Sequence, residues 1–212
     1  MNVGLRTYYA EGSKTVAYEI AEQLGWELPD VVVCPIASGS LFSKVGRGFR
    51  DFRDLGLVDG VVPRLIGAQA AGCSPVASAW AEDRAVKPIR PATIVRSLAI
   101  GSPADGETAL ATVRETGGAI YPVPEDEVGE NMVLLASTAG VFGETAAGVT
   151  LGALRSAVRS GGITPGDTVV LLVTGDGLKT PGPVADRFRP VLVEADSDAF
   201  LEQLDLPLLQ KV

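Results

Sequence analysis

The chain has 212 residues, 46% of them hydrophobic, and its 18 basic and 26 acidic residues give a formal net charge of −8. This length allows one large or two small buried cores, so we expect a soluble globular protein. The acidic balance, without any lysine- and arginine-rich run, argues against a nucleic-acid partner. No apolar stretch approaches the roughly 20 residues of a membrane-spanning helix, and the N-terminus has no signal-peptide pattern. We therefore expect a cytoplasmic protein without a membrane partner.

The sequence contains no histidine, which removes the commonest general base and the usual zinc ligand. We accordingly expect no metal site. The two cysteines, Cys34 and Cys73, suggest a reducing compartment in which both behave as small apolar residues. Any chemistry then has to come from lysine, carboxylates, hydroxyls or a bound cofactor.

Hydrophobic spacing predicts helices and strands in alternation, because one-sided apolar stripes favour helices and short continuous apolar runs favour buried strands. In chain order we expect a helix over 13–24, a strand over 31–36, a helix over 41–52, an apolar segment over 63–69, a helix over 105–115, a strand over 119–122, helices over 125–138 and 145–158, and a buried strand over 168–174.

This alternation favours an α/β fold with three layers and a mainly parallel sheet, whose ligands gather at the carboxyl ends of the strands. The pattern weakens after Pro181, where three prolines and a short acidic stretch occur. We therefore divide the chain into a domain over 1–182 and a C-terminal extension over 183–212 that contains at most one helix.

The first candidate site is the turn between the strand over 31–36 and the next helix. It reads Ala37-Ser38-Gly39-Ser40-Leu41. Its backbone N–H groups and two hydroxyls would lie beside a helix N-terminus, an arrangement suited to a phosphate. The alternative is a plain structural connection, because small residues also permit tight turns. The turn matches neither a Walker A loop nor a GxGxxG fingerprint.

Two later segments are further candidates. Thr174 ends the last predicted strand and is followed by a glycine-rich turn, which could line a cleft or simply reverse the chain at Asp176-Gly177. The segment 143–148 opens a helix with small residues, and there Glu144 is either functional or a favourable acid at a helix N-terminus.

Six segments occur here in an order that resembles the fold-type II pyridoxal-phosphate-dependent enzymes of the tryptophan synthase β-like class, specifically the threonine synthases. They are Tyr9–Thr15, Pro35–Leu41, Gly67–Gln69, Ile100–Gly106, Glu144–Ala146 and Thr174–Lys179. No single segment is decisive, but the ordered set is specific. The resemblance runs from about Tyr8 to Pro181 and implies the C-terminal portion of such an enzyme, incomplete at the N-terminus.

The resemblance implies pyridoxal 5′-phosphate as the cofactor. The phosphate-binding residues would be those of the turn, which contribute backbone N–H groups and the hydroxyls of two serines: Ala37, Ser38, Gly39, Ser40 and Leu41. Thr174 would bond the pyridine nitrogen, and a neutral hydroxyl there would temper the electron-sink character of the ring. Ser38, Ser40, Leu41 and Ser102 stand where several family members have glycine or asparagine, and these departures bear on the substrate more than on the cofactor.

A Schiff-base lysine is also required, and in the family it lies well before the segment matching Tyr9–Thr15. None of the five lysines here matches its motif: Lys14, Lys44, Lys87, Lys179 and Lys211. We therefore expect the catalytic lysine upstream of Met1, no catalytic residue in this chain, and no activity of the chain alone. Lys179 is the substitute to consider, and Lys14 is most simply a structural or ion-paired residue.

The implied reaction of the complete protein converts O-phospho-L-homoserine and water to L-threonine and phosphate. Two alternatives stay open: a serine or threonine dehydratase-type lyase that uses the same cofactor, and a catalytically inactive subunit with the same fold. The expected partners are the amino-acid substrate and either a second copy of the complete protein, as a homodimer, or a missing N-terminal half.

Overall fold

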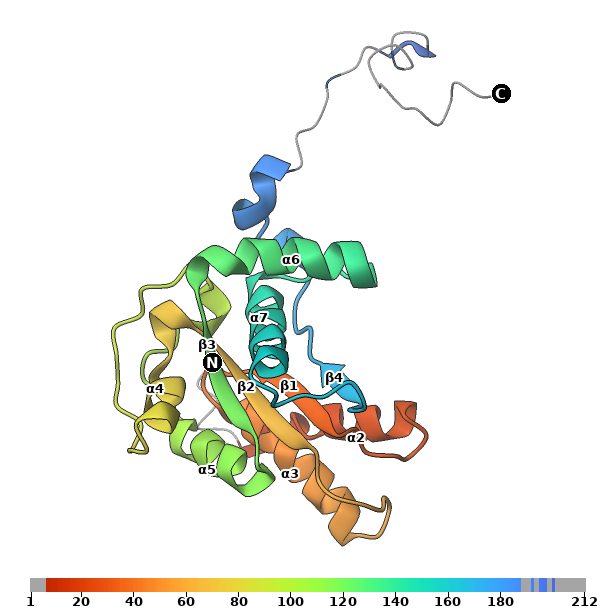
Figure 1. Cartoon of the computed structure of the whole chain (residues 1–212), viewed down its shortest axis with the longest axis vertical. Coiled ribbons are helices and arrows are strands. Elements are labelled where there is room, and N and C mark those ends of the chain that lie inside the picture. The colour runs from red at the N-terminus through yellow and green to blue at the C-terminus, as the bar shows by residue number, and fades with distance from the viewer. Residues whose placement is uncertain (1–6, 188–191, 193–194, 198–199, 201–212) are drawn as a thin grey trace.

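A computed structural model of the chain describes residues 7–187, 192, 195–197 and 200. Four strands form one sheet with helices on both sides (Figure 1): β1 (Val31–Pro35), β2 (Arg64–Ala70), β3 (Ala119–Val123) and β4 (Val169–Leu171). The α-helices are α1 (Thr7–Gly12), α2 (Thr15–Gln23), α3 (Ser40–Asp54), α4 (Pro75–Ala81), α5 (Gly106–Thr116), α6 (Glu125–Ala139) and α7 (Thr145–Arg159). The described 3₁₀ helices are η2 (Ala71–Cys73), η3 (Arg96–Leu98), η4 (Gly177–Lys179) and η5 (Gly182–Arg187).

The sheet is entirely parallel, with the order β3-β2-β1-β4. The central strand β1 has a neighbour on each side, so that Val33 lies opposite both Ile66 and Leu171. The chain adds β2 and then β3 on one side of β1, and afterwards returns to place β4 on the other. The strand order therefore reverses between β1 and β4, and such a switch point is where open α/β sheets bind ligands.

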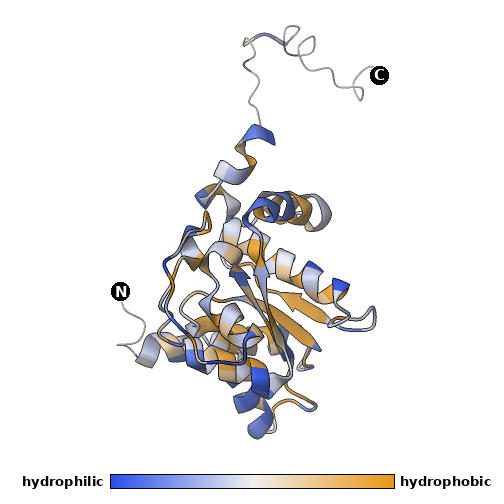
Figure 2. Ribbon diagram, turned by 60° about the vertical axis from the view of Figure 1, so that its left-hand side comes forward, coloured by the Kyte–Doolittle hydropathy of each residue, from blue (hydrophilic) through white to orange (hydrophobic). Residues whose placement is uncertain are grey.

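Alternate residues of β1 face different helical layers. Val32 and Cys34 belong to a core cluster with residues of α2, α3, α4 and α5, while Val31 and Val33 belong to a cluster with residues of α6 and α7. Figure 2 shows the hydrophobic strands between the two helical layers. The predicted α/β fold with a parallel sheet is thus confirmed. No described helix is long and apolar enough to cross a membrane.

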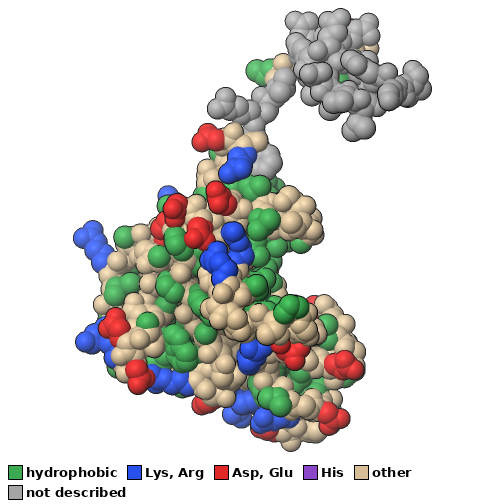
Figure 3. Space-filling view, viewed as in Figure 1, with side chains coloured by type: hydrophobic (Ala, Val, Ile, Leu, Met, Phe, Trp, Pro, Cys, Tyr) green, Lys and Arg blue, Asp and Glu red, His purple; other side chains and the backbone are tan. Residues whose placement is uncertain are grey.

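The last strand differs from its prediction. All five residues of β1 are buried, whereas Val169, Val170 and Leu171 of β4 are only half-buried. Among the described strands β4 pairs with β1 alone, so it lies at the sheet edge and its outer side is open. The expectation of a buried strand over 168–174 was wrong, because the strand covers only Val169–Leu171 and these three residues are half-buried. Figure 3 shows a hollow lined with hydrophobic atoms on one side of the molecule.

η5 begins at the predicted domain boundary, and its Val184 is buried in the cluster of α6 and α7. Most of the predicted extension over 183–212 lies outside the described residues, so the division of the chain stays a prediction.

Cys34 and Cys73 are free and buried, which confirms their apolar role. Burial raises the pKa of both thiols, and the nearby charge of Glu125 raises that of Cys73 further.

Candidate functional site

The turn after β1 changes direction at Gly39, whose φ of 92° lies in the left-handed region that favours glycine. A Cβ atom at this position would lie 2.5 Å from the backbone oxygen of Asp105, so the turn also has no space for a side chain. The Asp105 N–H donates to the Ser38 carbonyl over 2.8 Å. The segment matching Ile100–Gly106 therefore packs directly on the turn.

A buried glutamine supports the same turn from the neighbouring strand. The Gln69 side chain is fully buried; its Nε2 donates to the Ile36 carbonyl over 3.3 Å. Its Oε1 accepts from the backbone N–H groups of Val76 and Ala77, over 3.0 and 2.9 Å. Gln69 thus joins the end of β1 to the first turn of α4, which gives the segment Gly67–Gln69 a structural role.

Five of the six residues predicted to bind the cofactor lie around one cavity of about 150 Å³: Ala37, Ser38, Gly39, Leu41 and Thr174. The turn follows β1 and Thr174 follows β4, so the two parts meet at the switch point of the sheet. Ser40, the sixth, starts α3 beside the cavity and is only 4% exposed. The structure therefore brings together segments that lie more than 130 residues apart in the sequence.

The properties of the turn suit a phosphate. The Ser40 hydroxyl oxygen is buried and has no hydrogen-bond partner among the described residues. It lies in the first turn of the 15-residue helix α3, where unpaired N–H groups and the helix dipole favour an anion. No acidic side chain of the described chain lines the cavity. The residues present thus fit the phosphate group of pyridoxal 5′-phosphate.

Five further residues line the cavity without having been predicted as cofactor-binding: Pro35, Phe42, Ser97, Leu98 and Ala146. Ala146 belongs to the predicted small-residue segment at the start of α7, so a sequence signal for it existed. Ser97 and Leu98 lie on η3, a 3₁₀ helix within a long stretch that shows no hydrophobic period. Only the fold places η3 beside the turn.

The segment after β4 has both features predicted as alternatives: it lines a cavity, and it reverses the chain. Thr174 is exposed and lines the cavity. Beyond it, the Asp176 Oδ1 atom accepts from the Leu178 N–H over 2.8 Å and begins η4. The Gly177 N–H donates to the Phe142 carbonyl over 2.8 Å, and a Cβ at Gly177 would lie 2.5 Å from the Phe142 ring. Asp176-Gly177 does reverse the chain, and the reversal is fixed against the start of α7.

Glu144 occupies the N-cap position of α7 but makes no capping hydrogen bond with its side chain. It is only 6% exposed, and its backbone N–H donates to the Gly175 carbonyl over 2.9 Å. A Cβ at Gly175 would meet the Glu144 carboxylate, so the carboxylate lies against the backbone next to Thr174. The expected position at a helix start is confirmed, and the side chain points to the segment after β4.

The four lysines that the structure describes fall into two groups. Lys14 is ion-paired with Glu11 at 2.6 Å and Asp51 at 2.8 Å, as predicted, and Lys44 pairs with Glu11 at 2.6 Å. Hydrogen bonds from Lys14 and Lys44 lower the pKa of Glu11 to about 2. Lys87 and Lys179 are exposed. Lys211 lies outside the described residues.

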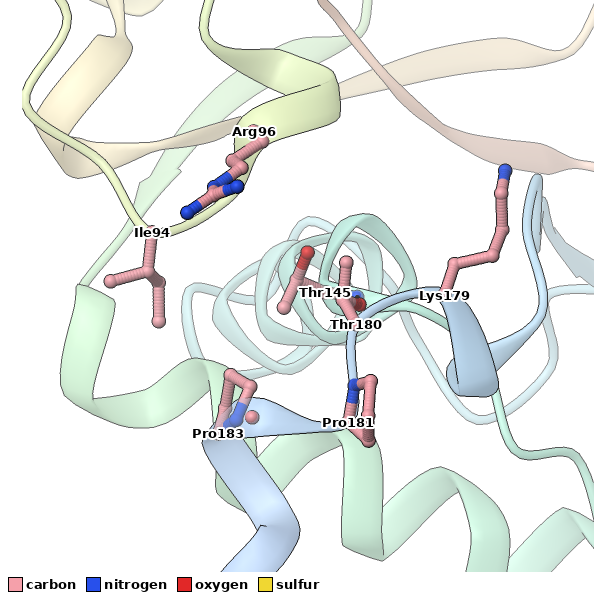
Figure 4. Close-up of a pocket in the computed structure, with 8 residues that line it drawn as sticks. Ile94, Arg96, Thr145, Lys179, Thr180, Pro181 and Pro183 are labelled. Atoms are coloured by element: carbon pink, nitrogen blue, oxygen red, sulfur yellow. The ribbon is translucent and has the colours of Figure 1, made fainter.

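Figure 4 shows a second cavity, of about 530 Å³. Adjacent residues connect the two: Arg96 lines the second cavity and Ser97 the first, and the same holds for Thr145 and Ala146. Lys179, from η4, contributes to the second cavity. The switch point thus carries two neighbouring cavities.

The sequence profile of the family described as "Pyridoxal-phosphate dependent enzyme" matches residues 1–175. Threonine synthase of Methanosarcina acetivorans is 34% identical over 203 residues, which cover 94% of this chain and 50% of that protein. Threonine synthase of Mycobacterium tuberculosis strain H37Rv is 33% identical over 198 residues, which cover 92% of this chain and 52% of that protein. The chain thus spans about half the length of the curated relatives it matches.

Solved structures of the same fold include a fungal L-serine ammonia-lyase from Rhizomucor miehei, with a TM-score of 0.66 and 21% identity over 81% of this chain and 53% of that chain. A maize serine racemase has a TM-score of 0.63 and 18% identity, covering 84% of this chain and 52% of that chain. This likeness confirms the fold class.

Proposed function

Because this chain belongs to the family of pyridoxal-phosphate-dependent enzymes, we propose that it forms the phosphate-binding side of a threonine synthase-like active site. The proposed reaction of the complete protein converts O-phospho-L-homoserine and water to L-threonine and phosphate. The observation that carries this proposal is the meeting of Ala37, Ser38, Gly39, Leu41 and Thr174 around one cavity at the switch point. The threonine synthases that match at 31–35% identity support the choice of reaction.

In this proposal each part of the site has a separate task. The backbone N–H groups over 37–41 and the hydroxyls of Ser38 and Ser40 bind the cofactor phosphate. The Thr174 hydroxyl donates a hydrogen bond to an unprotonated pyridine nitrogen. The cofactor, when bound, supplies the electron sink for chemistry at the carbon atoms of the amino acid. Gly39 and Gln69 keep the turn in the shape that this binding requires.

We propose that a lysine outside these 212 residues attaches the cofactor covalently. Either a separate N-terminal half supplies this lysine, or the complete protein carries it and acts as a homodimer in the cytoplasm. The purified chain with pyridoxal phosphate should then show no visible absorbance of a covalent protein adduct. A borohydride-stabilised adduct at Lys179, the exposed lysine that lines the second cavity, would overturn this part of the proposal.

The reaction is tested on the protein that contains this chain together with its lysine-bearing half. Phosphate release from O-phospho-L-homoserine is measured beside 2-oxoacid formation from L-serine and L-threonine. Threonine and phosphate should form in equal amounts, and Ser40→Ala should weaken the apparent affinity for the cofactor. Deamination without turnover of phosphohomoserine would refute the reaction, and binding of the cofactor without any turnover would favour an inactive subunit.

A further inference from the structure

The cavity proposed to hold the cofactor has one wall on a stretch of chain with little regular structure. Ser97 and Leu98 form this wall on η3, which is the only helix or strand described within residues 82–105. One carboxylate, that of Glu125 in the first turn of α6, bonds this stretch just ahead of η3. We propose that Glu125 is a positioning residue, which fixes η3 and so keeps the cavity wall in place for the cofactor. The effect on the cofactor rests on the proposed function, whereas the fixing of η3 does not.

The Glu125 carboxylate bonds two segments at once. Its Oε1 atom accepts from the N–H of Gly72, in η2 directly after β2, over 3.0 Å. Its Oε2 atom accepts from the Thr93 hydroxyl over 2.9 Å and from the Ile94 N–H over 3.0 Å. Hydrogen bonds to an ionised acceptor are about twice as strong as those between neutral groups. A single side chain therefore joins α6 and the end of β2 to the stretch before η3.

The Thr93 hydroxyl carries this constraint to η3. It donates to Glu125 and accepts from the Val95 N–H over 3.0 Å. Val95 is the N-cap residue of η3, and its carbonyl accepts from the Leu98 N–H over 3.0 Å. Val95 and Leu98 are both buried in the cluster of α6 and α7, and Leu98 also lines the cavity. A continuous chain of contacts thus runs from Glu125 to the cavity wall.

The two segments that Glu125 joins also pair with each other. The Ala92 N–H donates to the Gly72 carbonyl over 2.8 Å. A Cβ atom at Gly72 would lie 2.0 Å from the Ala92 carbonyl oxygen and 2.9 Å from Glu125 Oε1. Because Gly72 has no side chain, the two backbones can approach closely enough to pair, and the carboxylate can reach both of them. The attachment therefore depends on glycine at position 72.

Acidic side chains at the start of a helix also have an ordinary role, since they interact favourably with the helix dipole. The first turn of α6 contains three of them, Glu125, Asp126 and Glu127. Within the described part of the chain, only Glu125 of these three forms a hydrogen bond to the stretch before η3. Asp126 is exposed and carries the same charge in the same helix turn. It is therefore the matched control for the role of Glu125.

The fixing of η3 is tested on the 212-residue chain without cofactor, by amide hydrogen exchange followed by NMR. Glu125→Gln removes the charge and one of the two acceptor oxygens, whereas Asp126→Asn removes a charge from the same turn and leaves the contacts. In Glu125→Gln the Ile94 and Leu98 amides should exchange about tenfold faster, with the amides of β1 unchanged. Asp126→Asn should exchange as the parent chain does. Unchanged exchange at Leu98 in Glu125→Gln would overturn the inference.

The consequence for the cofactor is tested by calorimetric titration of the folded variants with pyridoxal 5′-phosphate. If the wall is in place in only a fraction of the molecules, the apparent dissociation constant rises by the inverse of that fraction. Glu125→Gln and Thr93→Val should each weaken binding about tenfold. Thr93→Ser, which keeps the hydroxyl, and Asp126→Asn should bind as the parent chain does. A purely structural role would lower the unfolding midpoint and leave the affinity of the folded chain unchanged.

The two sets of measurements separate this inference from the proposed function. Equal affinities of Glu125→Gln, Thr93→Val and the parent chain would refute the positioning role, and so would a Thr93→Ser variant that binds as weakly as Thr93→Val. A parent chain that does not bind pyridoxal phosphate, together with faster exchange at Leu98 in Glu125→Gln, would refute the proposed cofactor site. The fixing of η3 by Glu125 would stand in that case.

Discussion

The two strands that flank the switch point end in different surroundings. β1 is buried along its whole length and passes into a turn fixed by Gly39, Asp105 and Gln69. β4 is half-buried at the sheet edge and leads to the exposed Thr174. This chain therefore builds the proposed phosphate side of the site as part of its core. The side proposed to meet the pyridine ring is anchored mainly through the start of α7.

The largest effect is expected for Gln69→Leu. The substitution leaves the Ile36 carbonyl and the Val76 and Ala77 N–H groups without their side-chain partner in a buried setting. The free energy of unfolding should fall by about 3 kcal/mol, measured by chemical denaturation. Gln23→Leu is the control, because that exposed side chain bonds Glu19 on the same helix. If the two variants were equally stable, the β1 side of the site would not be held more firmly than the β4 side.

Gly39→Ala should have the next largest effect. An alanine here combines a φ of 92° with a Cβ placed 2.5 Å from a backbone oxygen. We expect about 2 kcal/mol of destabilisation and a loss of cofactor binding, followed by denaturation and by fluorescence titration. Gly166→Ala, where a Cβ would meet nothing within 4 Å, should leave both unchanged. Unchanged cofactor affinity in Gly39→Ala would mean that the turn does not bind the cofactor.

Thr174→Val should separate binding from stability. Thr174 is exposed at the open side of the site, so the free energy of unfolding should change by less than about 0.5 kcal/mol. Loss of one hydrogen bond to the ring should weaken pyridoxal phosphate binding about fivefold, measured by calorimetric titration. Thr138→Val, in the last turn of α6, serves as the comparison variant. A strongly destabilised Thr174→Val would show that the β4 side is as rigid as the β1 side.

The smallest effect concerns acid stability on the β1 side. Glu11 holds Lys14 and Lys44 near α3, and its pKa is lowered to about 2 from the ordinary 4.5. A lowered folded-state pKa stabilises the fold above the unfolded value, so this contribution is present above pH 4.5 and is lost as the pH falls toward 2. Glu11→Gln should therefore melt below the parent chain at about pH 6, and the two melting curves should converge near pH 2. A difference that does not depend on pH would contradict the ion pairing.

The sequence was informative where the signal is local. Continuous apolar runs identified β1 and β3, one-sided stripes identified α3 and α7, and the small residues between β1 and α3 marked the proposed phosphate turn. The short helix α4 was missed because its sequence, PVASAWA, has no polar face to create a stripe. The apolar run of β4 predicted a buried strand, whereas its three residues are only half-buried.

The rest of the site depends on tertiary packing. Ser97 and Arg96 lie on η3, whose position beside the turn follows from the course of a long segment without periodicity. The unpaired hydroxyl of Thr145 is recognised only when the neighbours of that side chain are known. The buried amide of Gln69 was part of a family segment, but its three hydrogen bonds join residues that no spacing rule relates.

The most direct measurement is an NMR titration of the 212-residue chain with pyridoxal 5′-phosphate and, in parallel, with pyridoxal, which lacks the phosphate. Amide signals of residues 37–41 should shift with pyridoxal phosphate and stay in place with pyridoxal, because the turn after β1 is proposed to bind the phosphate group. Equal shifts with both compounds, or none with either, would contradict the assignment of this turn as the cofactor-phosphate site.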